Sequence, residues 1–382
     1  MTIDRSAEIL AELPPGAIDR LTAALGRGRR AAGASTLHGA ALRAEAVRHL
    51  LLPVTVDPAW PHPTPPEVVG AGAVHADLID DDRDTFSRLR TTLDDDARTD
   101  AETVAARAQS WRLPVTPYRR PDDPAARLLR RAAHEAAAVV APAGGHPDGP
   151  PPATGRRGPA PSPSRRPGDT PVVIDLTALW AGPLATALLA EHGAAVIKVD
   201  AEVRPDGLRA RPAVYDALNR AKRIVDLDLR RDGDRQRFDE LLAQADLLID
   251  SFSRRVLPNL GYGPAVLAER FPDLVSIGIT AFPPDCPEAD WVAYGPGVHA
   301  AIGAARTVEG RWRPAPIAYP DALAGGEAFA VAAAALARPV PGRRFEVSLA
   351  AAVAPLVADG GPGTAPPVVE RSAPSPGPVV TS

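Results

Sequence analysis

Short runs of β-branched residues alternate with helical patterns between residues 171 and 359, and this alternation restricts the fold more than any other feature of the sequence. The runs that are typical of strands cover residues 171–177, 194–199, 223–229, 246–250 and 274–280. Strand–helix–strand alternation predicts an α/β fold with a Rossmann-like, mostly parallel sheet and helices on both faces. In such sheets a ligand usually lies beyond the carboxyl ends of the strands.

Segments rich in proline and glycine divide the chain. Residues 141–170 combine many prolines with glycines and paired arginines, so they cannot bury a core, and we predict a linker there. Residues 360–382 have the same character and predict a disordered tail. Residues 171–359 lie between these segments as one domain, and residues 1–140 predict a smaller α+β domain. Its expected strands are 50–56 and 68–79, and its expected helices 84–93, 100–111 and 124–140.

Composition excludes several classes of function. The formal charge is −4, with 43 basic against 47 acidic residues, which argues against a nucleic-acid partner. One cysteine, Cys286, allows neither an intramolecular disulfide nor a thiolate cluster, and the histidines lack the spacing of metal ligands. We find no signal segment and no apolar run of the roughly 18 residues that a membrane span needs. The sequence therefore predicts a cytoplasmic protein without a metal or membrane partner.

Lysine is scarce, while arginine is abundant. Lysine occurs only at Lys198 and Lys222, among 43 basic residues. A coding bias that replaces lysine by arginine explains the scarcity. Under such a bias, the remaining lysines are expected where a compact ammonium group matters, because arginine and lysine are not interchangeable at such places.

A series of short motifs follows a fixed order along the chain. They are 181–183 (AGP), 192–200 (HGAAVIKVD), 204–207 (RPDG), 219–223 (NRAKR), 251–257 (SFSRRVL), 321–325 (DALAG) and 342–348 (GRRFEVS). In this order they resemble the family III CoA-transferases, which include formyl-CoA transferase and carnitine CoA-transferase. The resemblance covers most of residues 171–352. It implies a CoA-binding domain, an interlocked homodimer, and acyl-CoA and a carboxylic acid as substrates, with no permanently bound cofactor.

Asp321 is the expected nucleophile. Transfer of CoA between acids needs a carboxylate that attacks a thioester and then carries CoA as an enzyme thioester. The resemblance implies this role for Asp321, because the family nucleophile occupies the DxxxG position. Local sequence alone favours a different role, in which Asp321 caps the amino end of a helix over residues 322–337.

The resemblance also implies a set of CoA-binding residues: Ala181, Gly182, Lys198, Arg209, Lys222, Arg223, Phe252, Arg255 and Tyr294. The cations among them suit the phosphates of CoA, since an anionic ligand requires a basic crevice. They also suit a solvated strand edge, and Phe252 fits either an adenine stack or the core.

Several positions depart from the family pattern. Ser251, Asn259 and Gly295 replace the family's Asn, Arg and Asp, and Tyr294 stands where the related acyl-CoA racemases carry a catalytic histidine. The chain also lacks the family's long C-terminal part, although 72–93 and 102–117 resemble phrases of its small domain. Two alternatives to a transferase therefore stay open: a non-catalytic CoA-binding paralogue and, disfavoured by Tyr294, an acyl-CoA racemase.

Overall fold

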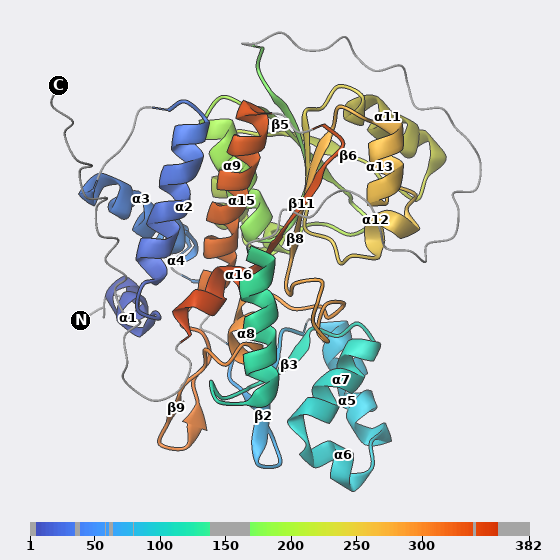
Figure 1. Cartoon of the computed structure of the whole chain (residues 1–382). Helices are drawn as coiled ribbons and strands as arrows, with labels where there is room; N and C mark the ends of the chain where they lie inside the picture. The colour runs from blue at the N-terminus through green and yellow to red at the C-terminus, as the bar shows by residue number, and fades with distance from the viewer. Residues whose placement is uncertain are drawn as a thin grey trace, which may run out of the picture.

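The computed structural model describes residues 5–34, 39–57, 59–60, 64–78, 80–137, 169–338 and 341–357. A six-stranded parallel sheet forms its centre (Figure 1). The strands are β4 (Val172–Leu176), β5 (Ala195–Asp200), β6 (Arg223–Asp226), β7 (Leu247–Asp250), β8 (Val275–Thr280) and β11 (Arg344–Ser348). Their spatial order is β11-β8-β7-β4-β5-β6. Numbered along the chain this is the order 3-2-1-4-5-6 read backwards, which is that of doubly wound nucleotide-binding sheets.

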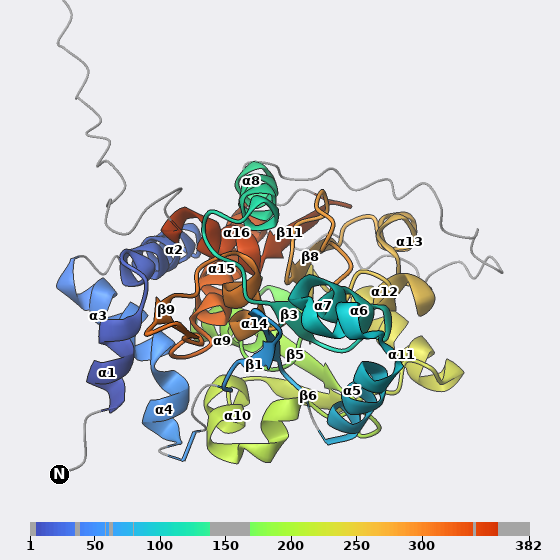
Figure 2. The same cartoon turned by 90° about the horizontal axis from the view of Figure 1, so that it is seen from below.

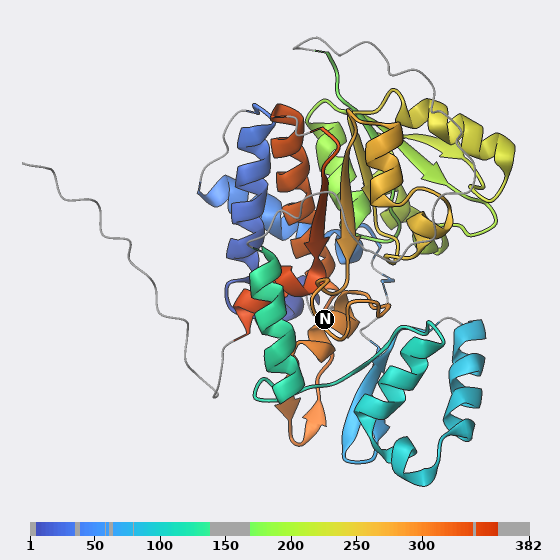
Figure 3. The same cartoon turned by 45° about the vertical axis from the view of Figure 1, so that its right-hand side comes forward.

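Helices cover both faces of the sheet, as the alternation predicts (Figures 1 and 3). One face carries α9 (Ala181–Glu191), α10 (Pro212–Asn219) and α15 (Tyr319–Ala337), and the other α11 (Asp232–Leu242), α12 (Val256–Asn259) and α13 (Pro264–Arg270). Alternate strand residues serve the two cores. In β7, Leu247 and Ile249 join the α9–α15 core, and Leu248 joins the opposite one. A strand buried on both faces reads as a continuous apolar run, which is why it is visible in the sequence.

The N-terminal helices belong to the main body. They are α1 (Arg5–Glu12), α2 (Ala17–Ala31), α3 (Ala40–Leu50) and α4 (Leu52–Val56), and α2 packs along α15 as an outer layer (Figure 1). Small residues allow the close contact, because a Cβ at Gly28 would lie 2.3 Å from the Phe329 ring and one at Gly326 2.5 Å from Leu21. The helices α8 (Pro124–Ala137) and α16 (Leu349–Val353) complete this layer. The expectation of one small domain over residues 1–140 is thereby revised, since its first part shares the main core.

A separate α+β lobe follows these helices in the chain and lies below the sheet in Figures 1 and 3. Its antiparallel sheet contains β1 (Glu67–Val69), β2 (Gly72–Ala76) and β3 (Val115–Pro117). Its helices are α5 (Asp80–Thr92), α6 (Asp95–Thr99) and α7 (Ala101–Ser110), with a core of their own. The lobe thus covers only part of residues 1–140, over which the sequence predicts a single α+β domain.

The lobe holds the segment that leads into α14 (Gly295–Ala301), which Figure 2 shows between β3 and α15. The side-chain amide of Gln109 bonds both backbone groups of Val292: it donates to the carbonyl at 2.8 Å and accepts from the N–H at 2.7 Å. The Thr116 hydroxyl donates to the carbonyl of Gly297 at 3.0 Å. Buried Arg119 pairs with Glu288 at 2.7 Å. The lobe therefore fixes the backbone on both sides of the start of α14.

Short elements complete the described fold: β9 (Thr307–Val308), β10 (Arg311–Trp312), and the 3-10 turns η1 (Gly207–Ala210) and η2 (Ala354–Leu356). Two expected strands are wrong. Residues 50–56 are helical, because Pro53 suits the first turn of a helix and not a paired strand. The expected strand over residues 68–79 is replaced by a hairpin of Glu67–Val69 and Gly72–Ala76, which turns at Gly70, whose φ is +54°. No described helix is long and apolar enough to cross a bilayer. The predicted linker, up to residue 168, and the predicted tail lie outside the described residues.

Candidate active site

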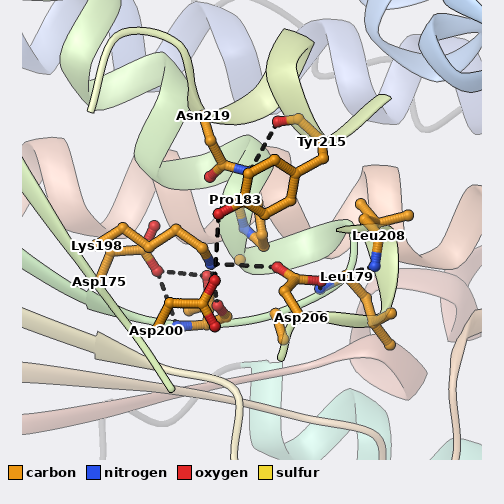
Figure 4. Close-up of polar contacts among 12 residues, drawn as sticks. Asp175, Leu179, Pro183, Lys198, Asp200, Asp206, Leu208, Tyr215 and Asn219 are labelled. Atoms are coloured by element: carbon orange, nitrogen blue, oxygen red, sulfur yellow. Dashed lines mark hydrogen bonds and ion pairs between the residues drawn. The ribbon is translucent and has the colours of Figure 1, made fainter. Parts of the chain in front are cut away.

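Four buried charges meet at the carboxyl end of β4. Figure 4 shows Asp175, Lys198 and Asp206 among them. Lys222 lies 3.0 Å from Asp175, and Lys198 lies 3.2 Å from Asp206, with all four side chains at most 1% exposed. We call these four residues the buried charge cluster. Its formal charges cancel, which makes burial tolerable because each ion keeps a counter-ion.

The ammonium group of Lys222 uses all of its donors. It donates to Asp175 at 3.0 Å, to the carbonyl of Pro183 at 3.0 Å and to Asn219 at 2.9 Å. Burial outweighs the attraction of Asp175 and lowers the pKa of Lys222 to about 8. Burial alone would raise the pKa of Asp175. The positive charges of Lys222 and Lys198 outweigh this effect and hold the pKa of the carboxyl below its usual value. Three acceptors around one point charge suit lysine and not the planar guanidinium of arginine.

The cluster holds the turn from β4 into α9. Leu179 has a left-handed φ of +65°, and its N–H donates to Asp206 at 3.0 Å. A Cβ at Gly182 would lie 2.2 Å from that of Thr177, so the first turn of α9 packs directly on the end of the strand. Ala181 and Gly182 are accordingly buried. Any contact of Ala181 and Gly182 with CoA, which the resemblance implies, would therefore involve only their backbone atoms at the start of this helix.

Asp321 lies in the first turn of α15, where the amino ends of α14 and α15 meet. The helix begins at Tyr319 with Ala318 as its N-cap, so the interpretation of Asp321 as an N-cap is wrong. The residue is 7% exposed, and its Oδ2 is buried without a hydrogen-bond partner among the described residues. A Cβ at position 295 would lie 2.0 Å from this oxygen. Any side chain at that position would require the Asp321 carboxylate to shift, whereas Gly295 leaves it in place.

Burial is the main cause of an unusual acidity at Asp321. It raises the pKa to about 7, and the negative charge of Asp77 adds to the effect. The backbone N–H groups of Gly295 and of Asp321 itself oppose the shift, because they favour the ionised form. A carboxyl group with a pKa near neutrality in an enclosed site is a functional-site candidate on physical grounds.

The lobe supplies an acidic group whose charge acts on Asp321. Asp77 follows β2, lies 2.9 Å from the Nε2 of His75, and has a buried Oδ2 without a hydrogen-bond partner in the described chain. Tyr294 precedes α14 and is 37% exposed. Burial, Asp77, Asp82 and Asp321 raise the pKa of its phenol, and Arg204 opposes this. Tyr294 therefore stays protonated at neutral pH.

The structure distributes the predicted cationic ligands over several places. Lys198 and Lys222 are enclosed in the buried charge cluster, so their ammonium groups do not face a ligand. Arg209 is half exposed, binds Asp200 at 2.7 Å and lies over the ring of Tyr215. Arg223 is the exposed first residue of β6, at the end of the strand away from its carboxyl edge. Only Arg209 of these four is both exposed and near the carboxyl edge.

The two residues after β7 are also placed. Phe252 is half-buried and packs against the core on the α11–α13 side. Arg255 is 60% exposed and pairs with Asp290 at 3.0 Å. The geometry does not bring either side chain to Asp321.

Sequence reasoning missed Asp77, His75 and the close contact at Gly295. The segment 72–93 shows a family phrase but no spacing that links it to a residue more than two hundred positions later. Arg204 lies in the 204–207 motif, but the motif does not identify it as a ligand-binding residue. The contacts that join these groups are tertiary and leave no local pattern.

Comparison with known proteins identifies the class. The model of CoA-transferase family III matches residues 171–362, which is half of the chain. The chain therefore belongs to CoA-transferase family III.

Curated relatives match over part of their length. Succinyl-CoA:mesaconate CoA-transferase of Haloarcula hispanica is 36% identical over 124 residues, 29% of this chain and 31% of that protein. Acetyl-CoA:oxalate CoA-transferase of Acetobacter aceti is 31% identical over 37% of this chain and 39% of that one. Formyl-CoA:oxalate CoA-transferase of Escherichia coli is 30% identical over 40% and 38%. The aligned segments thus span about a third of the length of these relatives.

Solved structures are similar over half of the chain. The protein Rv3272 of Mycobacterium tuberculosis is 30% identical, with 50% of this chain and 57% of that chain covered and a TM-score of 0.46. A CAIB/BAIF family protein of Brucella suis is 24% identical, with coverages of 51% and 56% and a TM-score of 0.45.

The environment of Lys222 predicts that Lys222→Arg destabilises the fold. The larger planar group cannot occupy the space between three acceptors, so the free energy of unfolding should fall by about 2–4 kcal/mol. Arg223→Lys is the matched control, because Arg223 is adjacent to Lys222 in the chain but its side chain is exposed. This control should change the free energy of unfolding by no more than about 0.5 kcal/mol. Urea denaturation of both variants measures the difference. Equal stability of the two would contradict the role of the buried charge cluster.

The environment of Asp321 predicts that Asp321→Asn stabilises the protein above neutral pH. The folded-state pKa of Asp321, about 7, lies above the unfolded value, so the wild type loses stability as pH rises between about 4 and 7. Asparagine mimics the protonated form and avoids this loss. The gain in unfolding free energy should be near zero at pH 3 and reach about 2–4 kcal/mol at pH 8. Denaturation curves at both pH values test this prediction. A gain that is independent of pH would show that ionisation of buried Asp321 is not the cause.

Proposed function

We propose that this protein transfers CoA from an acyl-CoA donor to a carboxylic acid acceptor, with Asp321 as the covalent nucleophile. The supporting observation is a buried carboxylate whose Oδ2 has no partner among the described residues, at the meeting point of two helix starts in a chain of CoA-transferase family III. The names of the relatives, which are CoA-transferases for succinyl-CoA, acetyl-CoA and formyl-CoA, support this reaction class.

The reaction proceeds through two exchanges at Asp321. The carboxylate attacks the donor thioester carbonyl, the C–S bond breaks, and CoA thiolate leaves behind an acyl–aspartyl anhydride. The thiolate then attacks the aspartyl carbonyl, which releases the donor acid and forms an aspartyl-CoA thioester. The acceptor carboxylate attacks this thioester, and the thiolate released attacks the acceptor carbonyl of the new anhydride. Acceptor-CoA leaves, and the carboxylate of Asp321 is regenerated.

The surroundings of Asp321 suit this sequence. Its exclusion from water leaves the ionised form poorly solvated and therefore reactive, while a pKa of about 7 keeps a large fraction ionised at neutral pH. The N–H of Gly295 stabilises negative charge at this carboxyl, and we propose that it also receives the charge on the aspartyl oxygen when thiolate attacks.

Arginines at the carboxyl edge are the proposed contacts for the CoA phosphates. Arg204 is exposed and has no side-chain partner in the described chain, and its charge reaches Tyr294. Arg209 is half exposed nearby. Lys198 and Lys222 act as positioning residues, because they hold the turn that starts α9. The homodimer that the resemblance implies remains part of this proposal.

Tyr294 disfavours racemisation. A two-base mechanism needs a group that accepts a proton near neutral pH, and the raised pKa of the Tyr294 phenol makes it a poor base. Solvent deuterium should therefore not enter the α-carbon of a bound acyl-CoA.

The central prediction is a covalent intermediate on Asp321. Incubation with a panel of acyl-CoA donors should give an adduct that mass spectrometry maps to Asp321 and that hydroxylamine removes. Asp321→Asn should form no adduct but still bind CoA. Asp273→Asn, at an exposed aspartate, is the control and should react like the wild type. CoA binding without an adduct for any donor would favour the non-catalytic paralogue, and an adduct on Asp321→Asn would reject this nucleophile.

A second prediction concerns Asp77. The rate of adduct formation should rise with pH through a midpoint near 7, because the ionised form of Asp321 reacts. Asp77→Asn removes a neighbouring negative charge, which lowers the pKa of Asp321, so the midpoint should move down by about half a pH unit or more. Asp82→Asn is the matched control, since Asp82 affects Tyr294 but is not among the charges that shift Asp321. An unmoved midpoint in Asp77→Asn would contradict the coupling.

A further inference from the structure

A second cavity lies beside the C-terminal end of α14, and Asp321 does not line it. Its volume is about 880 Å³, which is within the range of small-molecule sites. It lies between the α1–α2 connection, residues 120–122, the β9–β10 hairpin and the end of η2. We call it the hairpin cleft.

The walls of the hairpin cleft are mostly apolar. They comprise Pro14, Pro15, Pro121, Pro314, Pro316, Val308, Leu356 and Val357. Trp312 adds an aromatic surface and is backed by the ring of Tyr118, whose centroid lies 5.4 Å away. Prolines and a supported indole form a rigid surface, so an apolar molecule can bind there with little loss of side-chain freedom.

Three exposed arginines surround this apolar surface: Arg120, Arg306 and Arg313. Arg306 donates to the backbone carbonyl of Glu12 at 3.2 Å. The guanidinium groups of Arg120 and Arg313 have no partner within the described ranges. The acidic side chains that also line the cleft are Glu12 and Asp122. The formal charge of the lining is therefore positive by one.

The one deeply buried polar side chain among the lining residues is His299, which is 5% exposed. Its Nδ1 lies 2.9 Å from the hydroxyl of fully buried Tyr319. Burial and the nearby positive charges lower the pKa of His299 to about 3, and burial raises that of the Tyr319 phenol, so both groups are neutral. The hydroxyl of Tyr319 is fully buried, and Nδ1 is its one hydrogen-bond partner among the described residues, so we assign the phenol as the donor and place the imidazole proton on Nε2.

This Nε2–H is a donor that no described residue satisfies. Because His299 lines the cleft, an acceptor bound there can satisfy this donor. The groups that address a ligand here, the imidazole N–H and the guanidinium groups, are all donors. A carboxylate or phosphate oxygen is an acceptor that suits both kinds.

We propose that the hairpin cleft binds an amphipathic oxyanion, a molecule with an apolar body of several carbons and one carboxylate or phosphate head. The body lies against the prolines and Trp312, and the head accepts from the His299 N–H and the arginines. This site is separate from the Asp321 site, and its existence does not depend on the proposed transferase activity.

Isothermal titration of the full chain tests the proposal with four probes. Octanoate and octyl phosphate carry both head and body, 1-octanol carries the body alone, and acetate carries the head alone. At least one of the first two should bind saturably, and at least tenfold more tightly than 1-octanol or acetate. Comparison of octanoate with octyl phosphate decides which head is preferred. Absence of binding by both, or equal binding of 1-octanol, would overturn the proposal.

Variants assign the bound probe to this cleft and not to the Asp321 site. The double variant Arg120→Ala/Arg313→Ala should weaken binding at least tenfold, and both side chains are exposed, so the fold should tolerate the change. Arg230→Ala/Arg237→Ala, beyond the opposite face of the sheet, is the matched control and should bind like the wild type. Hydroxylamine-sensitive adduct formation should remain in both double variants. Undiminished binding in Arg120→Ala/Arg313→Ala would reject the hairpin cleft as the site.

Discussion

The interaction on which the other features depend is the buried pairing of two lysines with two aspartates at the carboxyl end of β4. It joins the strand to the first turn of α9, through Thr177, Pro183 and the left-handed turn at Leu179. That first turn in turn meets α15, because a Cβ at Gly325 would lie 2.7 Å from the carbonyl of Ala181. The position of α15, and with it the position of Asp321, therefore depends on charges that are enclosed within the fold. A cluster of this kind is costly to break, since either half would leave a buried ion without a partner.

Two buried aspartates in the same domain show how environment decides role. Asp175 has counter-ions and hydroxyl donors around it, so its pKa is depressed and it remains ionised and fixed. Asp321 is also buried, but the charge that acts on it is another carboxylate, that of Asp77, and no cation offsets this. The first arrangement stabilises the fold, whereas the second costs stability above neutral pH and leaves a poorly solvated carboxylate. Sites that break a local rule in this way are where function is expected.

The central sheet could be predicted from the sequence because its strands are buried on both faces and read as apolar runs. The N-terminal region could be predicted only in part. Pro53 reverses the assignment of residues 50–56, and one expected strand is a hairpin. The scarcity of lysine correctly singled out Lys198 and Lys222 as positions where a compact cation matters. It could not tell a phosphate from a buried aspartate as the partner, because both suit an ammonium group, and that choice depends on residues such as Asp175 that lie far away in the chain. The convergence of Asp77 and Gly295 on Asp321 is tertiary and has no counterpart in local sequence.

The proposed nucleophile and the groups that set its acidity come from different parts of the chain. The segment matched by the family model supplies Asp321 and Gly295, whereas Asp77 comes from the lobe that precedes it in sequence. The lobe is joined to the start of α14 through Gln109 and Val292, which are 183 residues apart. Contacts of such long sequence separation form only after the intervening chain has been ordered, since loop closure opposes them. The residues of the central sheet and of the buried charge cluster all come from residues 171–357, whereas the charge of Asp77, which adds to the raised pKa of Asp321, comes from the lobe. In this chain the strand order therefore arises within one segment, whereas the acidity of the site also depends on the lobe.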